Sequence, residues 1–168
     1  MNMIRKLFLS IFVLMLSCRF NNPFYPKAEI VLSSNLQTIT LSYEISPGQI
    51  RLTYPKLQLL FREIYGGTYG VVDSARVDYY YPGSDPIRDS IVKELPPYKA
   101  GFFLYIPPDK EVLTEFDLVT DEVENLFAPD KGNFEGPLNA TLTFYGKDGN
   151  EHNFKLFLTV TLQRVLPD

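Results

Sequence analysis

Only one histidine and one cysteine are available for chemistry in this 168-residue chain, His152 and Cys18. A serine or cysteine hydrolase needs a histidine base beside its nucleophile, so any such arrangement would have to use His152. The chain contains no Gly-x-Ser-x-Gly sequence, which holds a nucleophilic serine at a sharp turn. His152 follows a polar, glycine-containing stretch, where a histidine is more often an ordinary surface residue. The sequence therefore predicts no enzyme, and a hydrolase is the least favoured of three hypotheses.

Metal and cofactor sites are not expected either. Zinc and copper sites need clusters of His and Cys, which one residue of each kind does not provide. Acidic residues at 148–151 and between 117 and 130 offer oxygen ligands for calcium, but neither stretch has the Asp-x-Asp-x-Asp-Gly spacing with a distal Glu. We interpret them as a polar hairpin turn and a solvated helical turn. The glycine-rich stretch 66–70 lacks the lysine of a phosphate cradle and is expected to be a loop.

Aromatic side chains supply the remaining candidate site. Phe and Tyr make up an aromatic content of 14%, and Trp is absent. Three of them are expected to face outward: Tyr69 in the glycine-rich loop, Tyr80 opposite its two neighbouring tyrosines, and Phe157 on the polar side of the last strand. Exposed aromatic residues stack on sugar rings or anchor protein interfaces. These three residues are therefore the candidate binding surface, with simple packing at sheet edges as the commoner alternative.

The N-terminal 18 residues have the pattern of an export signal. Arg5 and Lys6 precede an apolar run of ten residues, 7–16, broken only by Ser10. Such a run fits the core of a signal peptide and is too short to span a bilayer as a helix. The sequence Met15-Leu16-Ser17-Cys18 that follows resembles the lipobox of bacterial lipoproteins. It departs from the usual pattern at Met15 and Leu16.

This resemblance implies that Cys18 is acylated and becomes the first residue of the mature chain. Two or three acyl chains hold a protein at a membrane because each buried CH₂ contributes about 0.8 kcal/mol. Residues 18–35, interrupted by Pro23 and Pro26, are expected to form the lipidated cysteine and a tether. The alternative is an ordinary secretory signal with a coincidental cysteine.

The expected location is the bacterial cell envelope. Arg19 after the cysteine resembles lipoproteins sorted to the outer membrane of bacteria with two membranes, where the protein would face the periplasm or the cell surface. The expected partners are the membrane, through the lipid anchor, and an envelope protein.

Charge argues against nucleic acids as partners. The chain has a formal net charge of −4, from 16 basic and 20 acidic residues. Residues 1–17 contain two of the basic residues and no acid, which leaves 14 basic against 20 acidic residues and a net charge of −6. An acidic domain gains little from the counterion release that drives binding to nucleic acids.

The elements that would position these residues are mostly strands. Apolar and polar residues alternate with a period of two, and turn-forming Pro and Gly residues separate the segments. Strands are expected at 39–45, 50–54, 75–81, 87–95, 101–106, 112–119, 138–145 and 154–162, and 57–64 is left open. A short helical turn is expected at 120–127, capped by Asp121.

The last two strands form the clearest element, a β-hairpin around the turn 146–150. The segment LNATLTFYGKDGNEHNFKLFLTVTL resembles the closing hairpin of bacterial immunoglobulin-like domains. The resemblance implies an all-β, immunoglobulin-like sandwich of about seven to eight antiparallel strands at 36–168, after a signal at 1–17 and the tether at 18–35. The antibody subclass is excluded, because it needs two cysteines and a tryptophan. Another sandwich or a small barrel is the alternative.

The expected function is that of a membrane-tethered, non-enzymatic interaction module of the cell envelope. A carbohydrate-binding module that uses exposed tyrosines is the alternative, because fold alone does not determine function.

Overall fold

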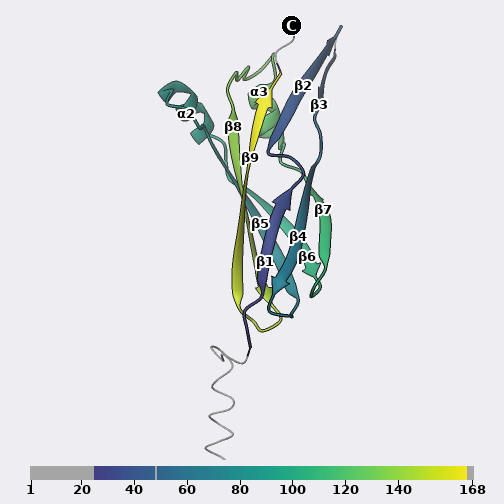
Figure 1. Ribbon diagram of the computed structural model, residues 1–168. Coiled ribbons are helices and arrows are strands. Elements are labelled where there is room, and N and C mark those ends of the chain that lie inside the picture. The colour runs from purple at the N-terminus through teal and green to yellow at the C-terminus, as the bar shows by residue number, and fades with distance from the viewer. Residues whose placement is uncertain (1–24, 48, 166–168) are drawn as a thin grey trace, which may run out of the picture.

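Most of the alternating segments form strands in the computed structural model, which describes residues 25–47 and 49–165 (Figure 1). Within these residues there are nine strands and two short helices. The strands are β1 (Glu29–Ser34), β2 (Thr38–Ser46), β3 (Gln49–Thr53), β4 (Leu57–Tyr65), β5 (Gly70–Tyr80), β6 (Tyr98–Ile106), β7 (Glu111–Phe116), β8 (Leu138–Asp148) and β9 (Asn153–Arg164). The helices are α2 (Pro86–Lys93) and α3 (Asp121–Phe127). The prediction of an all-β fold is confirmed, and the segment 57–64, whose pattern in the sequence is ambiguous, lies in strand β4.

The strands form two sheets. Three strands form one sheet in the order β1-β4-β7, and six form the other in the order β3-β2-β9-β8-β5-β6. All neighbours are antiparallel except β2 and β9, which pair in parallel through residues 38–41 and 161–164. The strand count therefore exceeds the seven to eight expected from the sequence, and one pair breaks the expected antiparallel pattern.

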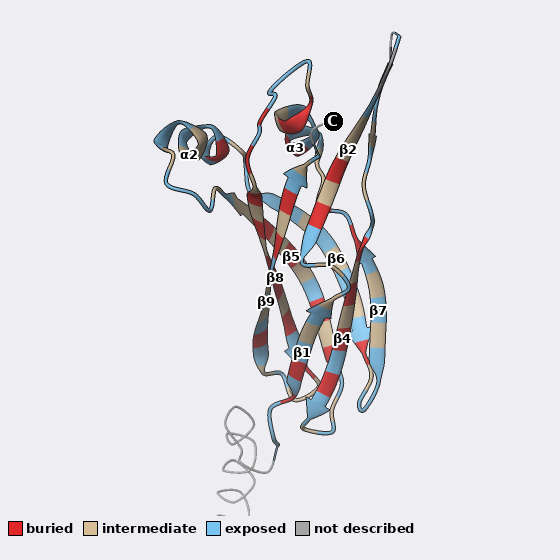
Figure 2. Cartoon of the chain, turned by 45° about the horizontal axis from the view of Figure 1, so that its top comes forward, coloured by how far each residue is buried: buried red, intermediate tan, exposed pale blue. Residues whose placement is uncertain are grey.

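The core lies between the two sheets, where inward positions of most strands are buried (Figure 2). In β8 the alternating apolar residues that the sequence indicates are buried: Leu138, Ala140, Leu142 and Phe144. Strand β9 pairs with β8 from Asn153 to Leu162, and Leu162 lies opposite Leu138. The predicted C-terminal hairpin and its inward face are thus confirmed.

Four phenylalanines join the sheets at the centre of the core. Phe61 and Phe116 come from the three-stranded sheet, and Phe102 and Phe144 come from the six-stranded sheet. The ring centroids of Phe61 and Phe144 lie 5.3 Å apart with their planes at 90°, and those of Phe116 and Phe144 lie 5.7 Å apart at 79°. Edge-to-face contacts of this kind stabilise a core by about 0.5–1.5 kcal/mol beyond the burial of area. We call these residues the phenylalanine quartet.

Helix α2 corrects the prediction of a strand at 87–95. The carboxylate of Asp85 accepts hydrogen bonds from the backbone N–H groups of Ile87 and Arg88, and Pro86 occupies the first turn. Both features start helices, because an N-cap satisfies free N–H groups and proline has none to satisfy. Lys93 and Asp89, one turn apart, add an ion pair with Nζ and Oδ2 2.6 Å apart. These local signals favour a helix over the expected strand.

The helical turn expected at 120–127 is confirmed as α3. Its N-cap is Thr120 and not Asp121, since the Thr120 hydroxyl accepts a hydrogen bond from the N–H of Val123. Val123 and Phe127, one turn apart, are buried and attach the helix to the core.

Strand β1 corrects the expected extent of the tether. Residues 29–34 fall within the range 18–35, yet they pair with β4 over six positions and bury Ile30. The alternation of Ile30 and Leu32 is too short to stand out in the sequence, and only pairing with β4 makes this segment a strand.

No helix among residues 25–47 and 49–165 is long and apolar enough to cross a membrane. The expected signal at 1–17 and the expected lipidation site, Cys18, lie outside the described residues.

Candidate binding surfaces

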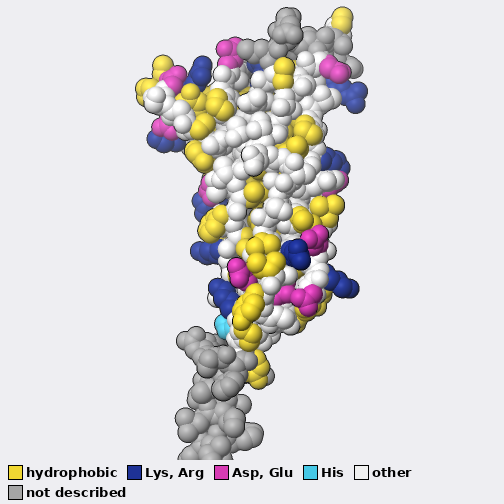
Figure 3. Space-filling model, in the orientation of Figure 1, with side chains coloured by type: hydrophobic (Ala, Val, Ile, Leu, Met, Phe, Trp, Pro, Cys, Tyr) yellow, Lys and Arg dark blue, Asp and Glu magenta, His cyan; other side chains and the backbone are white. Residues whose placement is uncertain are grey.

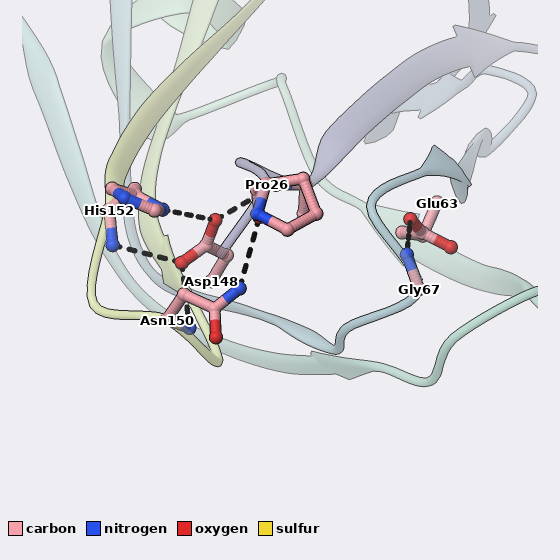
Figure 4. Close-up of polar contacts among 7 residues, drawn as sticks. Pro26, Glu63, Gly67, Asp148, Asn150 and His152 are labelled. Atoms are coloured by element: carbon pink, nitrogen blue, oxygen red, sulfur yellow. Dashed lines mark hydrogen bonds and ion pairs between the residues drawn. The ribbon is translucent and has the colours of Figure 1, made fainter. Parts of the chain in front are cut away.

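A buried carboxylate holds the N-terminal segment to the hairpin turn between β8 and β9. Asp148 is 3% exposed, and its oxygens accept hydrogen bonds from the backbone N–H groups of Ala28, Asn150 and His152, each at 2.9 Å (Figure 4). The ring Nδ1 of His152 lies 3.1 Å from the same carboxylate. The side-chain amide of Asn150 donates to the carbonyl oxygen of Pro26 at 3.0 Å. Residues 26–28 are therefore fixed to this turn.

The surroundings of Asp148 favour its ionised form. Burial is the largest single effect and by itself raises the pKa. Four hydrogen bonds lower the pKa: those from the backbone N–H groups of Ala28, His152 and Asn150 and the one with the His152 ring. Together they outweigh burial, so the pKa of Asp148 is lowered. The carboxylate is thus negative at neutral pH and serves as an acceptor for the backbone.

A second buried carboxylate, Glu63, joins two other turns at the same end of the domain. Glu63 is 1% exposed and accepts a hydrogen bond from the N–H of Gly67 at 3.0 Å (Figure 4). It also accepts one from the N–H of Asp109 at 3.2 Å. Four segments therefore lie together at this end: the turns at 65–69, 107–110 and 148–152, and residues 25–28. We call this end the base of the domain, and the opposite end, with α2, α3 and the β2–β3 hairpin, the far end (Figure 1).

Gly66 is the point where the β4–β5 turn meets the N-terminal segment. A Cβ there would lie 2.8 Å from Ala28 Cα and 2.9 Å from the Lys27 carbonyl oxygen, and its φ of 112° is unfavourable for other residues. Gly67 has a φ of 59°, but a Cβ there would meet nothing within 4 Å.

We expect Gly66→Ala to lower the free energy of unfolding by about 2 kcal/mol and Gly67→Ala by about 1 kcal/mol. Gly66→Ala should also loosen residues 27–28, so that trypsin cleaves after Lys27 faster than in the unchanged protein. Urea denaturation and timed proteolysis measure the two effects. If the two substitutions have equal effects, the close contact between Gly66 and residues 27–28 does not limit the side chain at this position.

The outer face of the six-stranded sheet carries two strongly exposed phenylalanines among polar residues. Phe157 in β9 is 64% exposed, and Phe103 in the edge strand β6 is 78% exposed. Thr143, directly opposite Phe157 in β8, is only 6% exposed. Arg76 in β5 stands beside Thr143 and forms an ion pair with Asp78. An apolar side chain surrounded by polar ones is a common anchor of protein interfaces.

A shallow hollow of about 530 Å³ lies on this face toward the base. It is lined by Lys27, Asp73, Tyr145, Gly146, Asn153, Phe154 and Lys155. The ammonium group of Lys155 lies 5.2 Å from the ring centroid of Tyr145, a cation–π contact. Because both signs of charge line the hollow, it does not select one ligand chemistry.

The three aromatic residues chosen from the sequence do not form one surface. All three are exposed, as expected, with exposed fractions of 41% for Tyr69, 43% for Tyr80 and 64% for Phe157. Tyr69 lies at the base, where its ring centroid is 5.4 Å from that of Tyr105. Tyr80 ends β5 at the far end, and Phe157 stands on the outer face.

Sequence reasoning missed two parts of these surfaces. Asp148 was interpreted as an ordinary polar turn residue, and its burial follows from the contact with Ala28, which is distant in the sequence. Phe103 alternates with the inward residues Phe102 and Leu104, so the period of two could have placed it outward.

Within the described residues, no three His, Cys, Asp or Glu side chains are grouped so as to hold a metal ion. No protein-family model matches the chain, and no curated protein is significantly similar to it.

Proposed function

We propose that the chain is a lipid-anchored lipoprotein of the bacterial cell envelope whose β domain is a non-enzymatic interaction module. The anchor is supported by the sequence pattern that ends at Cys18. The interaction role is carried by one observation, the two exposed phenylalanines on the outer face of the six-stranded sheet, Phe103 and Phe157. Their partner is an envelope protein.

The strand order supports an immunoglobulin-like fold for the domain. In such folds one sheet contains strands A, B and E, and the other contains C′, C, F and G. The orders β1-β4-β7 and β6-β5-β8-β9 follow this pattern, with β2 and β3 inserted after the first strand. Phe61 in β4 and Phe144 in β8 contact each other on the two strands that the disulfide joins in antibody domains. An aromatic contact thus takes the place of the disulfide.

The proposed interface has the layout of a small hot spot. A large apolar side chain releases water when a partner covers it, and nearby polar residues exclude solvent from its rim. Phe157 has such neighbours in Lys155 and Thr159 along its own strand and in Thr143 across from it.

The lipid anchor is tested by Cys18→Ala. This substitution removes the thiol that would carry the diacylglycerol, so we expect fatty-acid labelling to disappear and the protein to leave the membrane fraction. Labelling with a radioactive or clickable fatty acid, followed by membrane fractionation, measures both. Membrane residence that is unchanged by Cys18→Ala would refute the anchor.

The interface is tested by Phe157→Ser. Cells that produce the full chain are treated with a crosslinker, and a defined adduct with one envelope protein is expected. We expect Phe157→Ser to reduce this adduct at least tenfold, because hot-spot substitutions weaken binding by about 2 kcal/mol or more. Leu113→Ser is the matched control, since Leu113 is 62% exposed on the outer face of the other sheet. An adduct that is lost equally in both variants, or in neither, argues against this interface.

Carbohydrate binding through Tyr69 and Tyr80 acting together receives no support from their positions. They flank opposite ends of β5, which has 11 residues and is therefore about 33 Å long. A glycan would have to extend along the whole domain to stack on both rings. Glycan binding by either tyrosine alone is tested by Tyr69→Ala and Tyr80→Ala in a glycan-retention assay.

A further inference from the structure

Exposed tyrosines gather at the base of the domain. Among the described residues six tyrosines are classed as exposed, and four of them are at the base: Tyr25, Tyr65, Tyr69 and Tyr105. They come from separate parts of the chain. Tyr25 precedes β1, Tyr65 ends β4, Tyr69 precedes β5, and Tyr105 is one residue from the end of β6. Ile64, 48% exposed, lies beside them. Hydrophobic side chains are visible at this lower end in Figure 3.

The base is also where the chain leads toward Cys18. Residues 26–28 are fixed to the β8–β9 turn by Asp148 and Asn150, so the N-terminal segment leaves the domain only from this end. Seven residue steps separate Cys18 from Tyr25, and they span at most about 25 Å. If Cys18 is lipidated, as proposed above, the base is the part of the domain nearest to the bilayer.

We propose that the base rests on the bilayer surface, with its tyrosines in the headgroup layer, so that the far end points away from the membrane. This inference rests on the proposed lipid anchor and adds an orientation to it. Tyrosine suits that layer because its ring is apolar while its hydroxyl stays hydrated, and tyrosines are enriched at membrane interfaces. The two buried carboxylates, Asp148 and Glu63, hold the tyrosine-bearing turns together as one surface.

Charge at the base does not drive this contact. The exposed charged residues of the base turns and of residues 25–28 are Lys27 and Lys110 against Asp109 and Glu151. These charges balance, so attraction to anionic lipids is weak. The contact therefore depends on the aromatic rings and is expected to be insensitive to the fraction of anionic lipid.

The chain contains no Trp, so a single tryptophan is a clean fluorescent reporter of depth. The full lipidated chain is reconstituted in vesicles of phosphatidylethanolamine and phosphatidylglycerol whose acyl chains are brominated near the headgroup. Tyr65→Trp reports on the base, and Tyr69→Trp is a second reporter from another turn. Tyr80→Trp is the matched control at the far end, where Tyr80 is 43% exposed. Urea midpoints confirm that the variants are folded.

We expect the brominated lipid to quench the Tyr65→Trp and Tyr69→Trp variants at least twofold, with a blue-shifted emission, and to leave Tyr80→Trp unchanged within a tenth. The same result is expected at low and high phosphatidylglycerol. Protein that floats with the vesicles but shows no quenching at the base, or equal quenching at both ends, overturns the orientation and leaves the anchor intact. Protein without fatty-acid label that does not float overturns both the anchor and the orientation.

Discussion

Phe144→Ala is expected to lower the free energy of unfolding by about 3–5 kcal/mol, the usual loss when a buried phenylalanine is truncated. Phe144 is fully buried and its ring contacts Phe61, Phe102 and Phe116. The substitution therefore removes three aromatic contacts and leaves a cavity between the two sheets. Urea denaturation followed by circular dichroism measures the change.

Phe157→Ala is the matched control, because it removes the same side chain from the neighbouring strand. Phe157 is 64% exposed, so we expect a change within about 0.5 kcal/mol. If the two substitutions destabilise the domain equally, the phenylalanine quartet does not have the central role that its contacts indicate.

Asp148→Ala is expected to lower the free energy of unfolding by about 3 kcal/mol, because buried N–H groups without an acceptor are costly. The N–H groups of Ala28, Asn150 and His152 all lose the carboxylate. Residues 26–28 should separate from the β8–β9 turn, so trypsin is expected to cleave after Lys27 more rapidly. Glu151→Gln is the control in the same turn. Glu151 Oε2 lies 3.5 Å from Lys147 Nζ in an exposed ion pair, and such pairs contribute little to stability, so little change is expected.

Asp148 also gives the stability a dependence on pH. Its pKa is lower in the folded protein than its ordinary value of 3.8. A lowered folded-state pKa means that the stabilisation is present above the unfolded pKa and is lost as the pH falls through the folded one. Below about pH 4 the unchanged protein should therefore lose stability more steeply than Asp148→Ala. Urea titrations at several pH values measure the slopes, and equal slopes would show that Asp148 does not contribute.

The sequence predicts well those elements whose pattern is local. The β8–β9 hairpin follows from strict alternation and a polar turn. Helix α3 was placed correctly, although its cap is Thr120 and not the expected Asp121. Helix α2 is not predicted, because its start signal, Asp85-Pro86, lies in a Pro- and Gly-containing stretch that indicates a loop. Strand β1 exists through its pairing with β4, which no local pattern reveals.

The candidate surfaces were predicted only residue by residue. Alternation correctly placed Tyr80 and Phe157 outward, because the direction of a side chain in a strand is a local property. Whether exposed residues share a surface depends on strand order and register. Tyr69 and Tyr105 are 36 residues apart in the sequence, yet they meet because β5 pairs with β6.

The pairing of β1 has a mechanical consequence. The chain enters at the base, and β1 then runs toward the far end beside β4 (Figure 1). If a partner pulls on the far end while the N-terminal segment holds the base, β1 is pulled along its own axis. The hydrogen bonds between antiparallel strands lie perpendicular to the strands. A force along β1 therefore acts on all hydrogen bonds between β1 and β4 at the same time, in shear, and does not break them one after another. A domain held at its base is thus able to resist tension along the direction of β1.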